Sequence, residues 1–184
     1  LLNSTLQSDS IIAFYRIKDK TLELPSLTFN GKFNKIDINP YDLSIFENTL
    51  SNINHHYIGA FSFEGTSTSL NIKDFTLHSS DGGLNLKAGI FVKGGFKKPK
   101  WFISIPQLIA TQTQISYIHK LITSQKEQPH WLTQLGTVSY TGELGGYGKE
   151  LSTRAHIKTN IGNVQLDLGI HGKDINGHIN SSNI

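Results

Sequence analysis

The stretch "LSTRAHIKTNIGNVQLDLGI", residues 151–170, decides the fold. Apolar or small side chains alternate with polar ones through both halves, and Gly162-Asn163 between them is a turn dipeptide. Because a period of two places successive side chains on opposite faces of a strand, the stretch predicts a β-hairpin with one apolar and one wet face. The apolar face would carry Leu151, Thr153, Ala155, Ile157, Thr159, Ile161, Val164, Leu166, Leu168 and Ile170.

The same pattern occurs earlier in the chain. "GGLNLKAGI" (residues 82–90) matches "GNVQLDLGI" (residues 162–170) in its first glycine, its final Gly-Ile and its apolar positions. "IGAFSFEGT" (residues 58–66) and "LGTVSYTGE" (residues 135–143) share a second pattern of glycine, serine and aromatic positions. We interpret these two pairs of matched segments as a tandem repeat whose units bury their faces against each other. The alternative is that a common strand-turn-strand sequence pattern recurs by chance.

Outside these stretches, alternation and turn residues predict further extended segments. The expected strands cover residues 11–17, 21–33, 60–64, 70–78, 84–92, 101–105 and 137–141, with a last one in "DINGHINSS". Within residues 70–78, Leu70 and Ile72 are out of phase with Phe75 and Leu77, which predicts a β-bulge near Asp74.

Two segments show helical periodicity. Asn39 and Pro40 form a cap and a first helical position, and a stripe of Leu43, Phe46, Leu50 and Ile53 follows. Residues 112–125 place Ile115, Ile118, Leu121 and Ile122 on one side of a second helix, and residues 129–134 form a short extra turn carrying Trp131.

Together these segments predict a mainly β fold with two or three short helices. The sheet is expected to be curled, antiparallel or mixed, and built from tandem repeats, with the helices on or beside it. Residues 1–56 would hold strands and the first helix, residues 57–128 the first repeat unit with the second helix, and residues 129–184 the second repeat unit. All would belong to one continuous domain of a longer chain.

Composition excludes several classes of function. The net charge of the 184 residues is 17 − 14 = +3, which argues against nucleic acid as a partner. The chain has no Cys or Met and starts at Leu1, so we expect a processed form or an excised piece. No apolar run approaches the length of a membrane-spanning helix.

No motif predicts catalysis or a cofactor. His55 and His56 are adjacent, so in a strand they would point to opposite faces, and we expect a solvated turn rather than a metal site. "GELGGYGKE" (residues 142–150) resembles a phosphate loop, but Glu150 stands where Ser or Thr is required. No Ser-His-acid arrangement has supporting context. The expectation is a non-enzymatic protein with no catalytic, cofactor or metal site.

"VKGGFKKPKWF" (residues 92–102) interleaves lysines with aromatic residues. Its lysines are Lys93, Lys97, Lys98 and Lys100, and its aromatic residues are Phe96, Trp101 and Phe102. Such a cluster suits a lipid headgroup or an acidic polymer, whereas the plainer interpretation is a hairpin tip with solvated lysines.

The second repeat unit resembles sequences of the TamB family of envelope bridging proteins, in its Bacteroidetes branch. The resemblance rests on residues 135–182, with Thr159-Asn160-Ile161-Gly162 at a Thr-x-x-Gly step and Asp167 in the return strand. "IDINPYDLSIF" and "FISIPQLIATQTQISYIHKLI" resemble the strand-to-helix passages of that family, so the likeness extends from about Leu24 onward. The lysine-rich turn departs from the family pattern.

The resemblance implies a periplasmic section of a protein anchored in the inner membrane, the anchor itself lying outside this fragment. Such proteins are expected to transport phospholipid or to help outer-membrane proteins assemble, with an outer-membrane barrel of the TamA or BamA type as a partner of the full-length chain. Phospholipid acyl chains would lie in an apolar groove of the sheet.

In this chain the candidate groove face consists of Leu84, Leu86, Ile90, Val164, Leu166, Leu168 and Ile170. The alternative is that the same side chains form an ordinary core beneath the helices. A competing hypothesis for the whole chain is a structural or carbohydrate-binding β-module, which predicts Trp101 and Trp131 side by side on an exposed platform.

Overall fold

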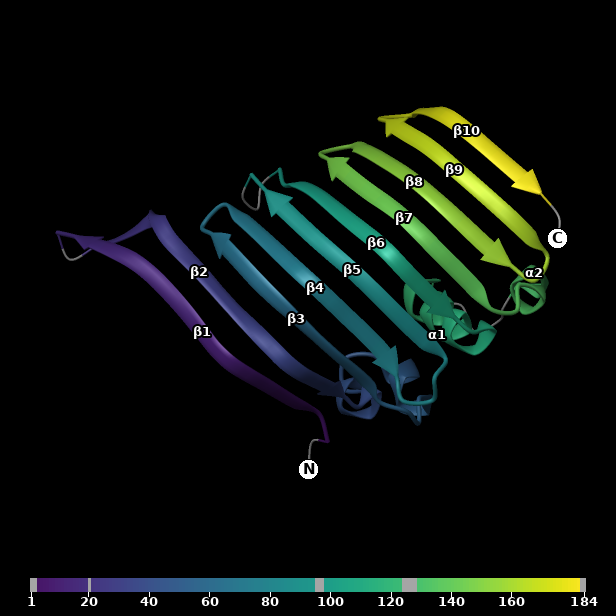
Figure 1. Cartoon of the computed structure of the whole chain (residues 1–184), viewed down its shortest axis with the longest axis horizontal. Coiled ribbons are helices and arrows are strands. Elements are labelled where there is room, and N and C mark those ends of the chain that lie inside the picture. Colours follow the sequence, from purple (N-terminus) through teal and green to yellow (C-terminus); the bar gives the residue numbers. More distant parts are fainter. Residues whose placement is uncertain (1–2, 20, 95–97, 124–128, 183–184) are drawn as a thin grey trace.

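A single open sheet of ten strands forms most of the molecule (Figure 1). The structure, a computed structural model, describes residues 3–19, 21–94, 98–123 and 129–182. Each strand pairs with its neighbours in the chain, and every pair is antiparallel. The strands are β1 (Thr5–Lys18), β2 (Thr21–Ile38), β3 (Tyr57–Thr66), β4 (Ser69–Ser79), β5 (Leu84–Lys93), β6 (Lys100–Ala110), β7 (Val138–Tyr147), β8 (Glu150–Thr159), β9 (Gly162–His171) and β10 (Asp174–Ser182). The predicted curled, β-rich fold class is confirmed.

The hairpin predicted from residues 151–170 is formed by β8 and β9. Leu151 pairs with Ile170 and Ala155 with Leu166, so the two apolar sets share a face as expected. The turn, however, is not Gly162-Asn163, because Thr159 already pairs with Gly162 and both belong to strands. The Thr159 hydroxyl accepts a hydrogen bond from the Ile161 amide and donates one to the Gly162 carbonyl, which closes the turn at residues 160–161.

All helices lie at one end of the sheet (Figure 1). The link from β2 to β3 holds two 3₁₀ helices, η1 (Pro40–Leu43) and η2 (Asn48–Asn52), and the link from β6 to β7 holds α1 (Gln112–Thr123) and α2 (His130–Gln134). We call this the helix end and the opposite end, which carries short strand connections, the turn end. Among the described residues no helix combines the length and apolarity needed to cross a bilayer.

The first helical prediction is wrong in type. The Asn39 side chain does cap Pro40 at the helix start, accepting a bond from the Tyr41 amide at 3.0 Å. The segment instead forms two 3₁₀ helices, because residues 39–56 must return the chain to pair Tyr57 with Ile38. One continuous helix over residues 40–53 would be about 21 Å long and would leave too few residues to span that distance back. Ile53 is buried, whereas Phe46 is 81% exposed, so the predicted apolar stripe does not form.

The second helix and the extra turn form where predicted, but α1 does not bury the predicted side. Ile118 and Leu121 are exposed, whereas Gln114 and Ser116 are buried. The residues after Thr123, up to 128, and the Ile122 side chain lie outside the described part. The polar inner side of α1 is explained by the hydrogen bonds described below.

Three β-bulges are aligned across the sheet. Register shifts occur between Phe33 and Ile36 in β2, between Ile72 and Phe75 in β4, and between Ile105 and Leu108 in β6. Asp74 has a positive φ of 53°, which confirms the bulge predicted there. The β6 bulge accommodates Pro106, so this strand extends five residues beyond its predicted end. Because a bulge bends its strand, the three together crease the sheet along one line.

The matched sequence patterns lie four strands apart. Residues 58–66 lie in β3, and their counterpart at 135–143 enters β7; residues 82–90 and 162–170 lie largely in β5 and β9. Strands four apart in an antiparallel meander run in the same direction, so matched residues keep the same face. Phe63 and Tyr140, for example, are both on the apolar face described next.

Candidate functional site

One face of the sheet is apolar from edge to edge. Three rows of directly paired residues cross all ten strands on this face, and Thr153 and Ser181 are the only members without a hydrocarbon, aromatic or glycine side chain. From β1 to β10 the rows are Leu6-Ile36-Gly59-Leu77-Leu86-Leu108-Tyr140-Ile157-Val164-Ser181, Ile11-Gly31-Phe63-Ile72-Ile90-Ile103-Leu144-Thr153-Leu168-Gly177 and Ala13-Phe29-Gly65-Leu70-Val92-Trp101-Gly146-Leu151-Ile170-Ile175. We call this surface the apolar face.

All seven residues of the predicted groove lie on the apolar face. Five belong to the three rows, Leu166 pairs with Ala155 between two of the rows, and Leu84 pairs with Ala110 one step nearer the helix end. Leu84 is 7% exposed, whereas the other six are only half-buried. The structure therefore brings the predicted residues of β5 and β9 onto one surface across the intervening β6, β7 and β8.

The described chain covers this face mainly at the helix end. Ile36, Leu84 and Ala110 are buried there, together with Ile53 before β3 and Leu132 of α2. Toward the sheet edges the face is most exposed; Leu6 on β1 and Ile175 on β10 are each 69% exposed. Most of the core therefore lies at the helix end, while the small Ala155 side chain is buried in the middle of β8 and the rest of the face is only partly covered.

Glycines on the apolar face make room for aromatic rings on the neighbouring strand. A Cβ on Gly31 would stand 2.6 Å from Cζ of Phe63, its partner in register, and one on Gly146 would stand 2.6 Å from the indole of its partner Trp101. The rings therefore lie across the glycines instead of standing up from the sheet. Phe29, Phe33, Phe61, Phe63 and Phe75 continue this surface, with ring centroids 5.1 to 6.2 Å apart.

Gln114 of α1 is the centre of a buried polar network at the helix end. Its side chain is fully buried, and its Oε1 accepts a 2.6 Å hydrogen bond from the Tyr57 hydroxyl. Its Nε2 lies 2.8 Å from His55 Nε2 and 3.3 Å from a carboxylate oxygen of Asp81. His55 Nδ1 lies 3.4 Å from Asp81, so the imidazole joins α1 to the β4–β5 turn.

The charges around Gln114 are held in defined states. The Ser79 hydroxyl donates to Asp81, and this bond, with the Gly83 amide and His55, lowers the pKa of the Asp81 carboxyl below 3.8. Burial, with the nearby Asp81 charge, raises the pKa of Tyr57 to about 12, so its hydroxyl stays a donor to Gln114.

The histidine pair does not form the predicted solvated turn. The His55 side chain is only 11% exposed, and its ring packs 5.0 Å from the Tyr57 ring. His56 points to the other side, where its Nδ1 lies 2.6 Å from Asp37 and lowers the pKa of that carboxyl. Sequence reasoning missed this arrangement because Gln114 is 59 residues from His55. Within the described ranges no three metal-binding side chains come together.

The opposite face is polar and carries shallow grooves along the creased line. One groove of about 540 Å³ contains Glu143, Arg154 and Asp167, and a second of about 630 Å³ contains Lys73, Asp74 and Phe91. Arg154 Nε lies 3.3 Å from Asp167 and Lys73 Nζ 2.6 Å from Glu64. These are exposed ion pairs, and they include no nucleophile paired with a base.

Two further sequence predictions concern surface motifs. Gly148 and Lys149, of the phosphate-loop-like segment, form the turn between β7 and β8, where Gly148 has a positive φ of 61°. Trp101 is the second residue of β6, at the turn end, whereas Trp131 lies in α2 at the helix end, so the two tryptophans do not form the predicted platform. Phe96 and Lys97 of the lysine-rich turn lie outside the described residues.

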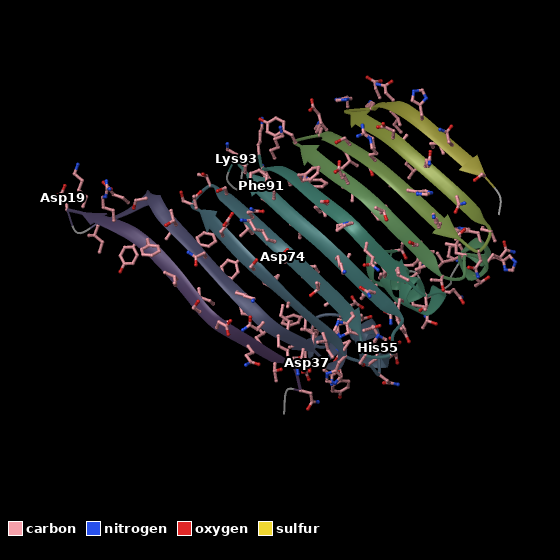
Figure 2. The ribbon with its side chains drawn as sticks, in the orientation of Figure 1. Asp19, Asp37, His55, Asp74, Phe91 and Lys93 are labelled. Carbon is pink, nitrogen blue, oxygen red and sulfur yellow. The ribbon has the colours of Figure 1, made fainter. Side chains whose placement is uncertain are left out.

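Figure 2 shows how these groups are distributed, with His55 and Asp37 at the helix end, Asp74 in the middle of the sheet, and Phe91 with Lys93 at the turn end. Away from the helix end, most side chains of the apolar face are only partly covered by the described chain. Comparison with known proteins identifies no relative: no family model, no curated protein and no solved structure matches this chain.

Proposed function

We propose that the chain is a non-enzymatic lipid-binding section that holds phospholipid acyl chains along its apolar face. The observation that carries this proposal is the continuity of the three rows across all ten strands, with no charged side chain in them. Ten strands at about 4.8 Å spacing give a surface about 43 Å long, against about 15 Å for the acyl layer of one leaflet. The face is therefore long enough for several chains side by side.

The energetics of such binding favour exchange. Each CH₂ group buried against the face contributes about 0.8 kcal/mol, so about ten groups hold a chain with micromolar strength. Nearly every strand contributes apolar side chains to the rows. An acyl chain that moves from one strand to the next therefore stays in contact with apolar surface. No nucleotide or catalytic group is required for that movement.

The cellular role that fits this surface is transfer between membranes. We infer a periplasmic section of a TamB-type bridging protein, anchored in the inner membrane through a part outside this fragment and serving phospholipid transport, outer-membrane protein assembly, or both. An outer-membrane barrel of the TamA or BamA type would be the partner of the full-length protein. The support for this role is the sequence resemblance together with a face suited to acyl chains.

Photo-crosslinking tests the proposal. Benzoylphenylalanine is placed in cells at Leu86 or Leu166 on the apolar face and, as matched controls, at their neighbours Lys87 and Gln165 on the polar face. Each control lies one residue away in the same strand, so the strand environment is the same and only the face differs. Lipid adducts are measured by mass spectrometry of the purified protein.

We expect phospholipid adducts from Leu86 and Leu166 and few from Lys87 and Gln165. Equal labelling at all four positions, or none at the apolar sites, would reject acyl-chain binding. The carbohydrate-binding alternative predicted adjacent tryptophans, but Trp101 and Trp131 lie at opposite ends of the sheet. No other observation favours that alternative.

A further inference from the structure

The two ends of the sheet differ in charge. At the turn end, six described lysines lie in the strand connections or at the adjoining strand residue. The acidic residues described in the same positions are Asp19, Glu150 and Asp174. The six are Lys18, Lys93, Lys98, Lys100, Lys149 and Lys173. The described connections of the helix end contain Asp42, Glu47 and Asp81 but only one lysine, Lys120. The molecule therefore has a basic end and an acidic end.

At the basic end two phenylalanines interrupt the polar face. Phe91 of β5 pairs with Phe102 of β6, and each is 41% exposed. Their other neighbours in register are Asn71 and Gly145, which offer them little apolar cover. Directly beyond this pair, toward the turn, Lys93 pairs with Lys100 on the same face.

The lysines of this cluster are free to meet an external anion. Among the described residues, no carboxylate lies within ion-pair distance of Lys93, Lys98 or Lys100, whereas Lys35 and Lys73 elsewhere on the sheet have acidic partners. Glu150, the next acid on this face, instead lies 3.8 Å from His171. We call Phe91, Lys93, Lys98, Lys100 and Phe102 the basic patch.

We propose that the basic patch docks the turn end of the sheet on the surface of an anionic phospholipid bilayer. Lysine stems lie along the interface with their ammonium groups at the phosphates, while an exposed aromatic pair enters the headgroup layer. Each lysine near such a surface strengthens binding about fivefold. A nucleic acid is a poorer match, because the net charge of the chain is only +3 and two further cations of the polar face, Lys73 and Arg154, are already paired with acids.

This inference is independent of acyl-chain binding, since it uses the polar face of the turn end and not the apolar face. Photo-crosslinking in the apolar face and vesicle docking by the basic patch can thus fail separately. If both hold, docking would bring the end of the apolar face that carries no helix toward the bilayer.

Vesicle co-sedimentation tests the docking. The full chain is mixed with vesicles of phosphatidylcholine alone or of phosphatidylcholine with phosphatidylglycerol, at about 0.1 M and about 1 M salt, where the Debye length falls from about 10 to about 3 Å. The variants are Lys93→Gln with Lys100→Gln, and Phe91→Ser with Phe102→Ser. Lys32→Gln with Lys158→Gln makes the same charge change on the polar face away from the patch, and Ile45→Ser with Phe46→Ser removes the most exposed apolar pair of the helix end.

We expect binding to the anionic vesicles only, about 25-fold weaker in the Lys93 and Lys100 variant and lost at high salt. The phenylalanine variant should also bind more weakly, while both control variants bind as the unaltered chain does. Several results would overturn the proposal: no anionic preference, an equal loss in the Lys32 and Lys158 control, or a loss confined to the Ile45 and Phe46 variant. Equally tight binding of heparin that ignores the phenylalanine substitutions would assign the patch to acidic polymers instead.

Discussion

Gly146 on β7 lies directly opposite Trp101 on β6, and the indole occupies the space where a Cβ at this position would stand. The same relationship joins Gly65 on β3 to Phe29 on β2. Gly65 belongs to the serine-aromatic pattern that recurs in the sequence, whereas its counterpart in the second copy, Gly142, pairs with Ile105 and Ala155. At Gly65 and Gly146 a large ring can lie flat on the apolar face because the opposite strand has no side chain there.

Gly146→Ala should therefore lower the free energy of unfolding by about 1–3 kcal/mol, because its Cβ would come within 2.6 Å of the indole and force Trp101 to move. Gly145→Ala is the control, since its closest contact would be the rotatable Ser152 hydroxyl at 3.3 Å, with Trp101 O and Phe102 Cδ2 at ordinary contact distances of 3.6 and 3.7 Å. Urea denaturation measures both. Equal losses of stability in the two variants would show that replacing any glycine in this part of β7 is destabilising, and that the Trp101 ring is not the cause.

The bulge at Asp74 gives a second prediction. With φ at 53°, Asp74→Val should destabilise the fold by about 1–2 kcal/mol, because a β-branched residue is strained in the left-handed region. Asp74→Gly and Asp74→Asn, both tolerant of that region, should change stability by less than about 1 kcal/mol. A valine variant as stable as the asparagine variant would contradict the bulge geometry.

The network around Gln114 should be important for holding α1 on the sheet. Gln114→Leu leaves the Tyr57 hydroxyl and His55 without their partner, so we expect a loss of about 1–3 kcal/mol in unfolding free energy. Thr113→Leu, on the exposed side of the same helix, should stay within about 0.5 kcal/mol. Thermal unfolding followed by circular dichroism distinguishes the two outcomes, and a neutral Gln114→Leu would show that the network is dispensable.

Acid should weaken the fold partly through Asp81. Its pKa in the folded state lies below the ordinary 3.8, chiefly because the Ser79 hydroxyl donates to it, so the unfolded chain binds the proton more readily. The stability that Asp81 contributes is therefore complete above its ordinary pKa and is lost as the pH falls through the lower, folded value.

Unfolding free energies measured between about pH 5 and pH 2 should fall less steeply in Asp81→Asn than in the unaltered chain. Asp174→Asn is the control, because no hydrogen bond or ion pair of the Asp174 side chain is present in the described chain. Parallel pH profiles for Asp81→Asn and the unaltered protein would contradict the assignment.

Most strands could be predicted from the sequence because the alternation of apolar and polar side chains is visible within each short segment. The face of Leu151 and Leu166, and the bulge at Asp74, could both be derived without the structure. What could not be derived depends on partners distant in sequence. Gln114 looks like an ordinary helix-surface residue until Tyr57 and His55 are placed beneath it.

The errors have a similar origin. Residues 40–53 have a helical period, but the chain must come back to its starting point because Ile38 pairs with Tyr57. Pro106 suggests the end of a strand, yet β6 continues through a bulge to Ala110. The candidate groove, by contrast, is predicted from alternation within two separate segments. The pairing register places its seven residues on one surface.

The ten strands alternate in direction, so the outermost two, β1 and β10, run opposite ways, and within the described chain each has hydrogen-bonding groups along one side unused. A second molecule could set its β1 against β10 of the first as one more antiparallel neighbour. Such a head-to-tail contact does not close on itself, so polymerisation into fibres is the hazard when the isolated chain is concentrated.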